Sequence, residues 1–189
     1  MKALLILATL TALAGCAGDP ADTAVVVFND LGYGSGVIIG PDRVLTAKHV
    51  VDSNGVFQIR TSDNALYSVK TVLLDVDDDL AVVVIEGVFS QPPAVLCPAP
   101  LVVGDAVQAV GTPSEVRLMN CILPGHVVKV DFDVEELGEY GLDVTDCHGM
   151  SGCSGGPLID SRGRVRAIVV VSNRMLLSAV PVGRLDEGL

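Results

Sequence analysis

A histidine, an aspartate and a serine follow one another along the chain in contexts that suit nucleophilic catalysis. His49 closes the segment 46–49 (Thr-Ala-Lys-His), Asp79 precedes the apolar run 80–85, and Ser154 lies in the glycine-rich stretch 152–156. A serine hydroxyl becomes a good nucleophile when a histidine accepts its proton and a carboxylate orients that histidine. The three segments therefore predict a catalytic triad with His49 as base, Asp79 as orienting acid and Ser154 as nucleophile.

Chain order and missing motifs exclude other hydrolases. The α/β-hydrolases also use Gly-x-Ser-x-Gly, but place the acid and the histidine after the serine, whereas His49, His126 and His148 all precede Ser154. A subtilisin-like order, in which the aspartate precedes the histidine and the serine, could use Asp42, but the local context of Asp42 does not support that role. The chain has no His-Glu-x-x-His and no Cys-x-x-Cys pair, so no metal site is expected.

The same segments resemble the trypsin-like (chymotrypsin-fold) serine proteases, and among them the bacterial HtrA-type protease domain. That group combines Gly-Ser-Gly, Thr-Ala-x-His, Asp-[Ile/Leu]-Ala and Gly-x-Ser-Gly-Gly-Pro-Leu, which match 34–36, 46–49, 79–81 and 152–158 here. The segment 178–182 is similar to the Phe-Ala-Ile-Pro segment of the group, and the resemblance runs from about residue 24 to 185. No PDZ module is expected. The resemblance implies a peptide or protein substrate, an acyl-enzyme intermediate and no cofactor.

The resemblance also assigns an oxyanion hole. The backbone N–H groups of Gly152 and Ser154 would donate to the tetrahedral oxyanion, and one such donor contributes about 3 kcal/mol. Cys153 stands where trypsin has an aspartate that pairs with a freed N-terminus. Activation by that route is therefore not expected.

The expected specificity pocket rests on the resemblance alone. His148, six residues before the nucleophile, would form the pocket floor and favour acidic side chains, or it is a loop histidine without such a role. Val169, Val170 and Val171 would form a wall that narrows the pocket toward small or aliphatic groups.

The first sixteen residues have the pattern of a lipoprotein leader. Lys2 precedes an apolar run too short to span a bilayer, which needs about 20 residues. The run ends in Leu-Ala-Gly-Cys, which resembles a bacterial lipobox, so we expect a signal peptide over 1–15, lipidation of Cys16 and a tether over 16–23. Ala17 favours the outer membrane over other sites in the bacterial envelope, with the protein periplasmic or surface-facing. The alternative is an ordinary secreted protein.

Charge and cysteines narrow the partners further. The formal net charge of −11 disfavours nucleic acid and direct adhesion to anionic lipid. In an exported protein the remaining four cysteines can oxidise, and four cysteines allow three pairings. We favour Cys97–Cys121 and Cys147–Cys153, the second as a clip for the oxyanion loop; the alternative is four buried thiols.

Short β-branched runs broken by Gly, Pro, Asn and Asp predict an all-β fold. Six expected strands lie on each side of a proline-rich linker, which suits two packed six-stranded antiparallel barrels over 24–90 and 101–189 with the linker at 91–100. The first barrel would supply His49 and Asp79, and the second Ser154. Two functions remain open: a lipid-anchored serine endopeptidase, and a catalytically silent trypsin-fold binding lipoprotein.

Overall fold

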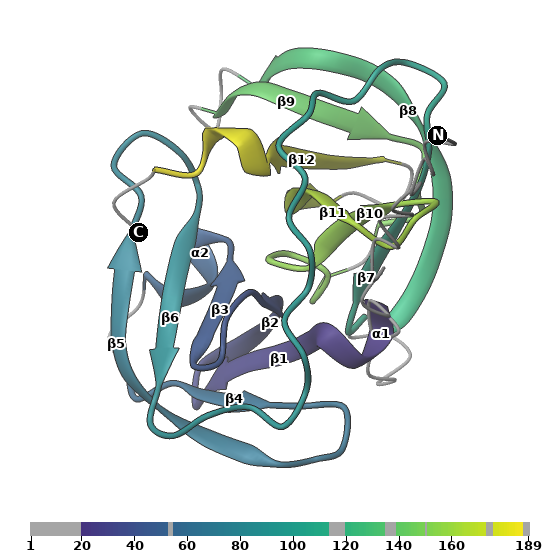
Figure 1. Cartoon of the computed structure of the whole chain (residues 1–189). Helices are drawn as coiled ribbons and strands as arrows, with labels where there is room; N and C mark the ends of the chain where they lie inside the picture. Colours follow the sequence, from purple (N-terminus) through teal and green to yellow (C-terminus); the bar gives the residue numbers. More distant parts are fainter. Residues whose placement is uncertain are drawn as a thin grey trace, which may run out of the picture.

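The described residues form two closed antiparallel barrels of six strands each (Figure 1). The computed structural model describes residues 20–52, 55–113, 120–134, 139–149, 151–172 and 176–186. The fold class predicted from the sequence is therefore confirmed. The expected signal peptide and the lipidation site Cys16 lie outside the described residues.

The first barrel follows a short helix, α1 (Pro20–Thr23), and has the ring order β1-β2-β3-β6-β5-β4. Its strands are β1 (Ala24–Asn29), β2 (Gly32–Ile38), β3 (Arg43–Thr46), β4 (Gln58–Arg60), β5 (Leu66–Leu74) and β6 (Ala81–Ile85). A single helical turn, α2 (Lys48–Val51), follows β3.

The second barrel repeats this connectivity, because its ring order is β7-β8-β9-β12-β11-β10. Its strands are β7 (Ala106–Gly111), β8 (Cys121–Val134), β9 (Glu139–Thr145), β10 (Pro157–Asp160), β11 (Val165–Ser172) and β12 (Leu177–Pro181). A 3₁₀ turn, η2 (Val182–Arg184), follows β12.

Strand β6 is apolar on both faces because each face meets a different core. Ala81, Val83 and Ile85 pack inside the first barrel. Leu80, which precedes the strand, and Val82 join the core between the two barrels. A strand buried on both sides reads as a continuous apolar run. Asp79 therefore stands at the entrance of one of the most enclosed strands in the molecule.

The linker between the barrels is attached to both of them as it crosses the front of the molecule (Figure 1). Ala94 N–H donates to Ile38 O of the first barrel at 2.8 Å, and Cys97 N–H donates to Val165 O of the second at 2.9 Å. These bonds join the linker to β2 and β11. The linker thereby fixes the position of the two barrels relative to each other.

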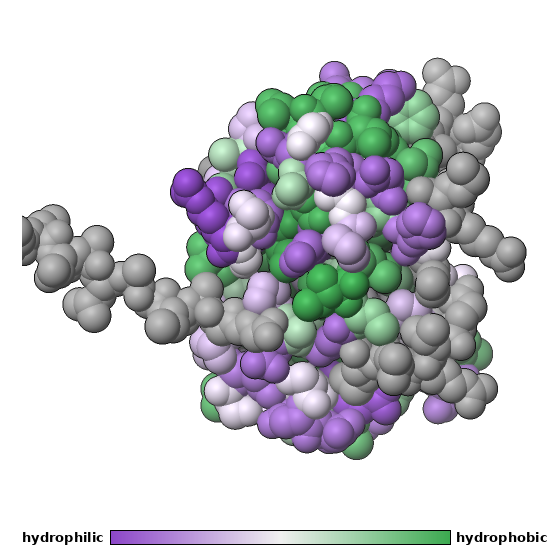
Figure 2. Space-filling model, turned by 90° about the vertical axis from the view of Figure 1, so that its right-hand side faces the viewer, coloured by the Kyte–Doolittle hydropathy of each residue, from purple (hydrophilic) through white to green (hydrophobic). Residues whose placement is uncertain are grey.

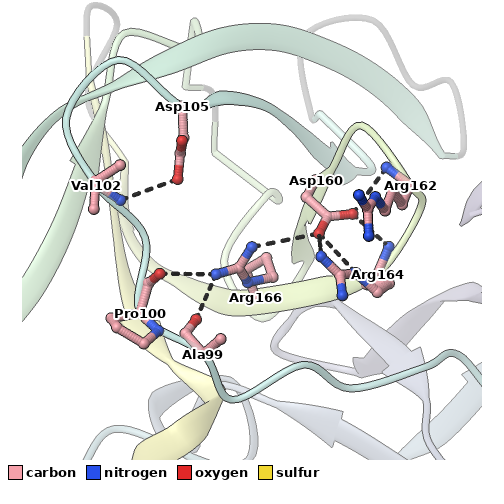
Figure 3. A network of polar contacts seen from close by, with 8 residues as sticks. All are labelled: Ala99, Pro100, Val102, Asp105, Asp160, Arg162, Arg164 and Arg166. Atoms are coloured by element: carbon pink, nitrogen blue, oxygen red, sulfur yellow. Dashed lines mark hydrogen bonds and ion pairs between the residues drawn. The ribbon is translucent and has the colours of Figure 1, made fainter.

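A buried arginine fixes the end of the linker (Figure 3). The Arg166 guanidinium donates to Ala99 O at 2.5 Å, to Pro100 O at 2.9 Å and to Asp160 Oδ2 at 3.3 Å. Arg164 Nε donates to the same Asp160 oxygen at 2.9 Å. Burial alone would raise the pKa of Asp160, but the Arg164 contacts and backbone N–H bonds lower it below its ordinary value.

The surface mixes polar and apolar residues. On the face shown in Figure 2, hydrophobic areas are divided by hydrophilic residues. Such interspersed apolar exposure is normal for folded proteins. Among the described helices, none combines the length and apolarity that a membrane crossing requires.

Asp143 on β9 generates a prediction about stability and pH. Burial, together with the charge of Asp131, raises the pKa of Asp143 to about 6, against an opposing effect of Arg166. The folded state therefore holds this proton more tightly than the unfolded chain does. Binding of this proton stabilises the folded state below about pH 4. As pH rises through about 6 the proton is lost, and the free energy of unfolding falls by up to about 3 kcal/mol.

Asp143→Asn should remove this part of the pH dependence. Urea unfolding of both proteins at about pH 4.5 and about pH 7.5 gives the comparison. The variant should gain stability relative to wild type at the higher pH. An equal free-energy difference between the two proteins at both pH values would contradict the assignment.

Candidate active site

The Asp79 carboxylate holds His49 at two atoms. Asp79 Oδ1 accepts the His49 backbone N–H at 2.9 Å, and Oδ2 lies 2.5 Å from the ring Nδ1. The Asp79 side chain is 10% exposed, whereas that of His49 is 48% exposed. Because Nδ1 is bound to the carboxylate, a proton arriving from a nucleophile would go to Nε2.

The turn before β6 places Asp79. Asp75 Oδ1 accepts the N–H groups of Asp77 at 3.0 Å and Asp78 at 3.1 Å, and Lys48 Nζ donates to Asp75 O at 2.7 Å. Burial acts to raise the pKa of Asp75, but these N–H bonds, one from Asp186 and the Lys48 charge together lower it. An ionised Asp75 thus shapes the turn that ends at Asp79.

The end of the second barrel supports the same turn. Arg184 of η2 forms an ion pair with Asp78 Oδ1 and also donates to Gly141 O at 3.3 Å. Asp186 N–H donates to Asp75 Oδ2 at 3.1 Å. The segment after β12 therefore connects the second barrel to the acidic turn of the first.

Ser154 lies in a tight loop before β10 that depends on glycine. Gly152 and Gly155 have φ values of 93° and 84°, in the region that favours glycine. Gly155 N–H donates to Val169 O at 2.7 Å, and Gly156 N–H donates to Cys153 O at 2.9 Å. The loop is thereby attached to β11 and closed on itself.

Ser35 of β2 supports this loop from the first barrel. Its Oγ donates to Gly152 O at 2.7 Å and accepts the Thr112 N–H at 3.0 Å. Its backbone N–H donates to Ser154 O at 2.8 Å. Ser35 is fully buried, so water cannot replace these bonds.

The nucleophile loop approaches the first barrel too closely for side chains. A Cβ on Gly155 would lie 2.1 Å from Ser35 O and 2.2 Å from Thr46 Oγ1. Thr46 ends β3, directly before the segment that carries His49. The structure therefore brings the Ser154 loop against the strand end next to His49 and Asp79.

Two of the three valines expected to form a pocket wall lie in hydrophobic cores. Val169 is fully buried in the core of the second barrel, and Val170 is 4% exposed in the core between the barrels. Their side chains point into cores because alternate residues of β11 face opposite sides. The Val171 side chain lies outside the described part. His148 is exposed after β9, and its role in specificity stays a prediction.

Neither favoured cysteine pair is brought together. Cys97 adjoins Val165 of β11, while Cys121 begins β8, and these strands lie three positions apart either way around the barrel. Cys147 adjoins Gly125, and Cys153 adjoins Gly111. Gly125 pairs with Val107, four residues from Gly111, which is about 13 Å along a strand. Disulfides require Cβ atoms about 4 Å apart, so the structure supports neither pairing.

Sequence reasoning missed the residues that support the triad from a distance. Ser35 belongs to the recognised Gly-Ser-Gly segment, but its bonds to Gly152 and Thr112 depend on the docking of the two barrels. Arg184 gave no local signal, because its partner Asp78 lies more than a hundred residues earlier in the sequence.

A cavity of about 750 Å³ extends to Thr112, the hydrogen-bond partner of Ser35. It is lined by the hairpin between β1 and β2, which includes Phe28, Leu31 and Tyr33, and by Arg60 and Thr112. Thr112 binds Ser35, which in turn binds the nucleophile loop. The cavity offers aromatic, aliphatic and charged groups, but none of His49, Asp79 and Ser154 lines it. Among the described residues, no cluster of His, Cys, Asp and Glu could hold a metal ion.

Ser35→Ala should destabilise the protein by about 1–3 kcal/mol, because Thr112 N–H and Gly152 O would lose their buried partner. Urea unfolding measures the change. Ser68→Ala, at an exposed position of β5, is the matched control and should change stability by less than about 0.5 kcal/mol. Equal effects of the two substitutions would contradict the role given to Ser35.

Comparisons with known proteins identify the family and the fold of the chain. The family model described as "Trypsin-like peptidase domain" matches residues 34–168. A protein of Arabidopsis thaliana named as a Do-like protease (Do-like 14) is 34% identical over 152 residues, which cover 73% of this chain and 35% of that protein. The chain thus spans about a third of the length of this relative.

Two solved structures share the fold. Both are inactive forms of Rv3671c from Mycobacterium tuberculosis H37Rv, one of them a serine-to-alanine mutant. Each match has a TM-score of 0.73 and covers 89% of this chain. The mutant is 22% identical in sequence and 88% of its chain is covered. The other structure is 23% identical and 90% of its chain is covered. On the match of the family model, the chain belongs to the family of the trypsin-like peptidase domain.

Proposed function

We propose that this protein is a serine endopeptidase that hydrolyses peptide bonds through His49, Asp79 and Ser154. The observation that carries the proposal is the double contact of the Asp79 carboxylate with the backbone and ring of His49. The docking of the Ser154 loop beside β3 and membership of the trypsin-like peptidase family support it.

In this mechanism the Ser154 hydroxyl attacks the carbonyl carbon of the scissile peptide bond. His49 Nε2 accepts the hydroxyl proton and then donates it to the leaving amine, which produces an acyl-enzyme. Water activated by His49 hydrolyses the ester. Asp79, bound to Nδ1, stabilises the imidazolium that forms in each step.

The oxyanion would be bound by the N–H groups of Gly152 and Ser154. The neighbouring N–H groups of Gly155 and Gly156 already donate to Val169 O and Cys153 O, so they serve the loop itself. Because N–H and C=O point in opposite directions across a trans peptide, the bond from Gly156 to Cys153 O directs the Ser154 N–H away from Gly156. This supports Ser154 N–H as a preorganised donor.

A fluorophosphonate probe tests the nucleophile. Wild-type protein should be labelled covalently, and Ser154→Ala should not, as read by intact-protein mass spectrometry. Asp79→Asn should slow labelling by up to about 10⁴-fold, because the histidine loses its oriented tautomer. Asp52→Asn, at an exposed site, is the charge-matched control and should react like wild type. A folded wild-type protein that resists the probe would instead support the silent binding module.

We also propose that a lipid on Cys16 anchors the protein to the bacterial envelope, with the outer membrane favoured. The support is the leader pattern that ends in Leu-Ala-Gly-Cys. Cys16 stands four residues before Pro20, the first residue of α1, so the anchor would lie close to the folded protein in the sequence. Peptide substrates would therefore be cleaved close to a membrane surface.

Cys16→Ser tests this anchor in a bacterial host. Wild type should sediment with membranes and carry the mass of a diacylglyceryl group, whereas Cys16→Ser should lose both. Cys97→Ser is the cysteine-matched control and should remain in the membrane fraction. Wild-type protein without the lipid mass would refute the anchor.

A further inference from the structure

Cys153, directly before the proposed nucleophile, occupies space that a side chain at Gly111 would fill. A Cβ on Gly111 would lie 3.0 Å from Cys153 Cα, 3.3 Å from its Cβ and 3.2 Å from its Sγ. Cys153 is 1% exposed. The thiol therefore packs against the end of β7.

Cys121 faces the same space from the neighbouring strand. It is the cross-strand partner of Gly111 in the β7–β8 pair. Directly opposed residues of antiparallel strands carry their Cβ atoms on one face, about 4.5–5.5 Å apart. Cys121 and Cys153 thus approach the Gly111 position from two sides, within the range from which a disulfide with Cβ atoms about 4 Å apart can form.

The other two cysteines are poor competitors. Cys147 lies at Gly125, about 13 Å further along the strands. Burial raises the pKa of its thiol, which lowers the reactive thiolate fraction. Cys97 adjoins β11 on the opposite side of the barrel.

We propose that Cys121 and Cys153 form a disulfide under oxidising conditions and that this bond ties the nucleophile loop to β8. In the reaction, a low-molecular-weight disulfide such as oxidised glutathione accepts two electrons and two protons from the thiols. The partly exposed Cys121 forms the mixed disulfide, and Cys153 displaces the second small thiol from it.

The bond would act on catalysis through the loop. The Cys153 carbonyl belongs to the same peptide unit as the Ser154 N–H, the proposed oxyanion donor, and it accepts the Gly156 N–H at 2.9 Å. Fixing the Cys153 side chain adds a covalent restraint to that unit. Cys121 is then a positioning residue. This part rests on the proposed peptidase function, whereas the disulfide itself does not.

Fragment mapping tests the disulfide without any need for activity. Cleavage after methionine by cyanogen bromide and after lysine and arginine by trypsin separates Cys121 (120–129), Cys147 (130–150) and Cys153 (151–162). Protein equilibrated with oxidised glutathione and then alkylated should yield 120–129 linked to 151–162. Cys97→Ser should yield the same link. A link that involves 130–150, or no link, would overturn the proposal.

The labelling rate with a fluorophosphonate tests the effect on the loop. Reduction of the oxidised wild type should slow labelling by about tenfold, part of the loss expected when a whole oxyanion donor is removed. Cys121→Ser and Cys121→Ala should react at the slow rate in both redox states. Equal rates for oxidised and reduced wild type would overturn the positioning role.

The two experiments separate the proposals. A mapped link with no labelling in either redox state would leave the disulfide standing, refute its positioning role and remove the peptidase function. Labelling of Ser154 without the link would support the peptidase function and overturn both the disulfide and its positioning role.

Discussion

The close approach of the nucleophile loop to the first barrel is the constraint on which the site depends. At Gly155 the backbone meets Ser35 O and Thr46 Oγ1 at distances that exclude any Cβ. A larger residue would force the barrels apart, and Ser154 would then move away from the strand end that carries His49. Because the proposed triad is divided between two barrels, its geometry depends on their interface.

The acid side of the site shows the same dependence on both barrels. Asp79 owes its position to a turn shaped by Asp75, and that turn is held in place by Arg184 and Asp186 from beyond β12. Each half thus supports the catalytic group of the other: Ser35 supports the nucleophile loop, and the segment after β12 supports the acid. Peptidase function then requires docked barrels, and a separated barrel would hold only part of the site.

Much of the fold was predictable because the strands have recognisable sequence patterns of their own. The apolar run of β6 and the short β-branched runs around it predicted six strands on each side of the linker, as the two barrels show. Which cysteines lie near one another could not be found from their spacing in the sequence, since it depends on the register that sets Cys121 opposite Gly111. The burial of Val169 and Val170 could not be predicted for the same reason, because register decides which face each residue of β11 presents.

A crystal structure of the protein after reaction with a fluorophosphonate would test the central claim most directly. With the probe bound to Ser154 Oγ, His49 Nε2 should lie about 3 Å from that oxygen while Nδ1 stays on Asp79. The phosphonyl oxygen should accept the N–H groups of Gly152 and Ser154. The account would be contradicted if the His49 imidazole pointed away from the adduct, or if the two barrels were displaced at Gly155. Either result would show that the interface between the barrels does not assemble a working triad.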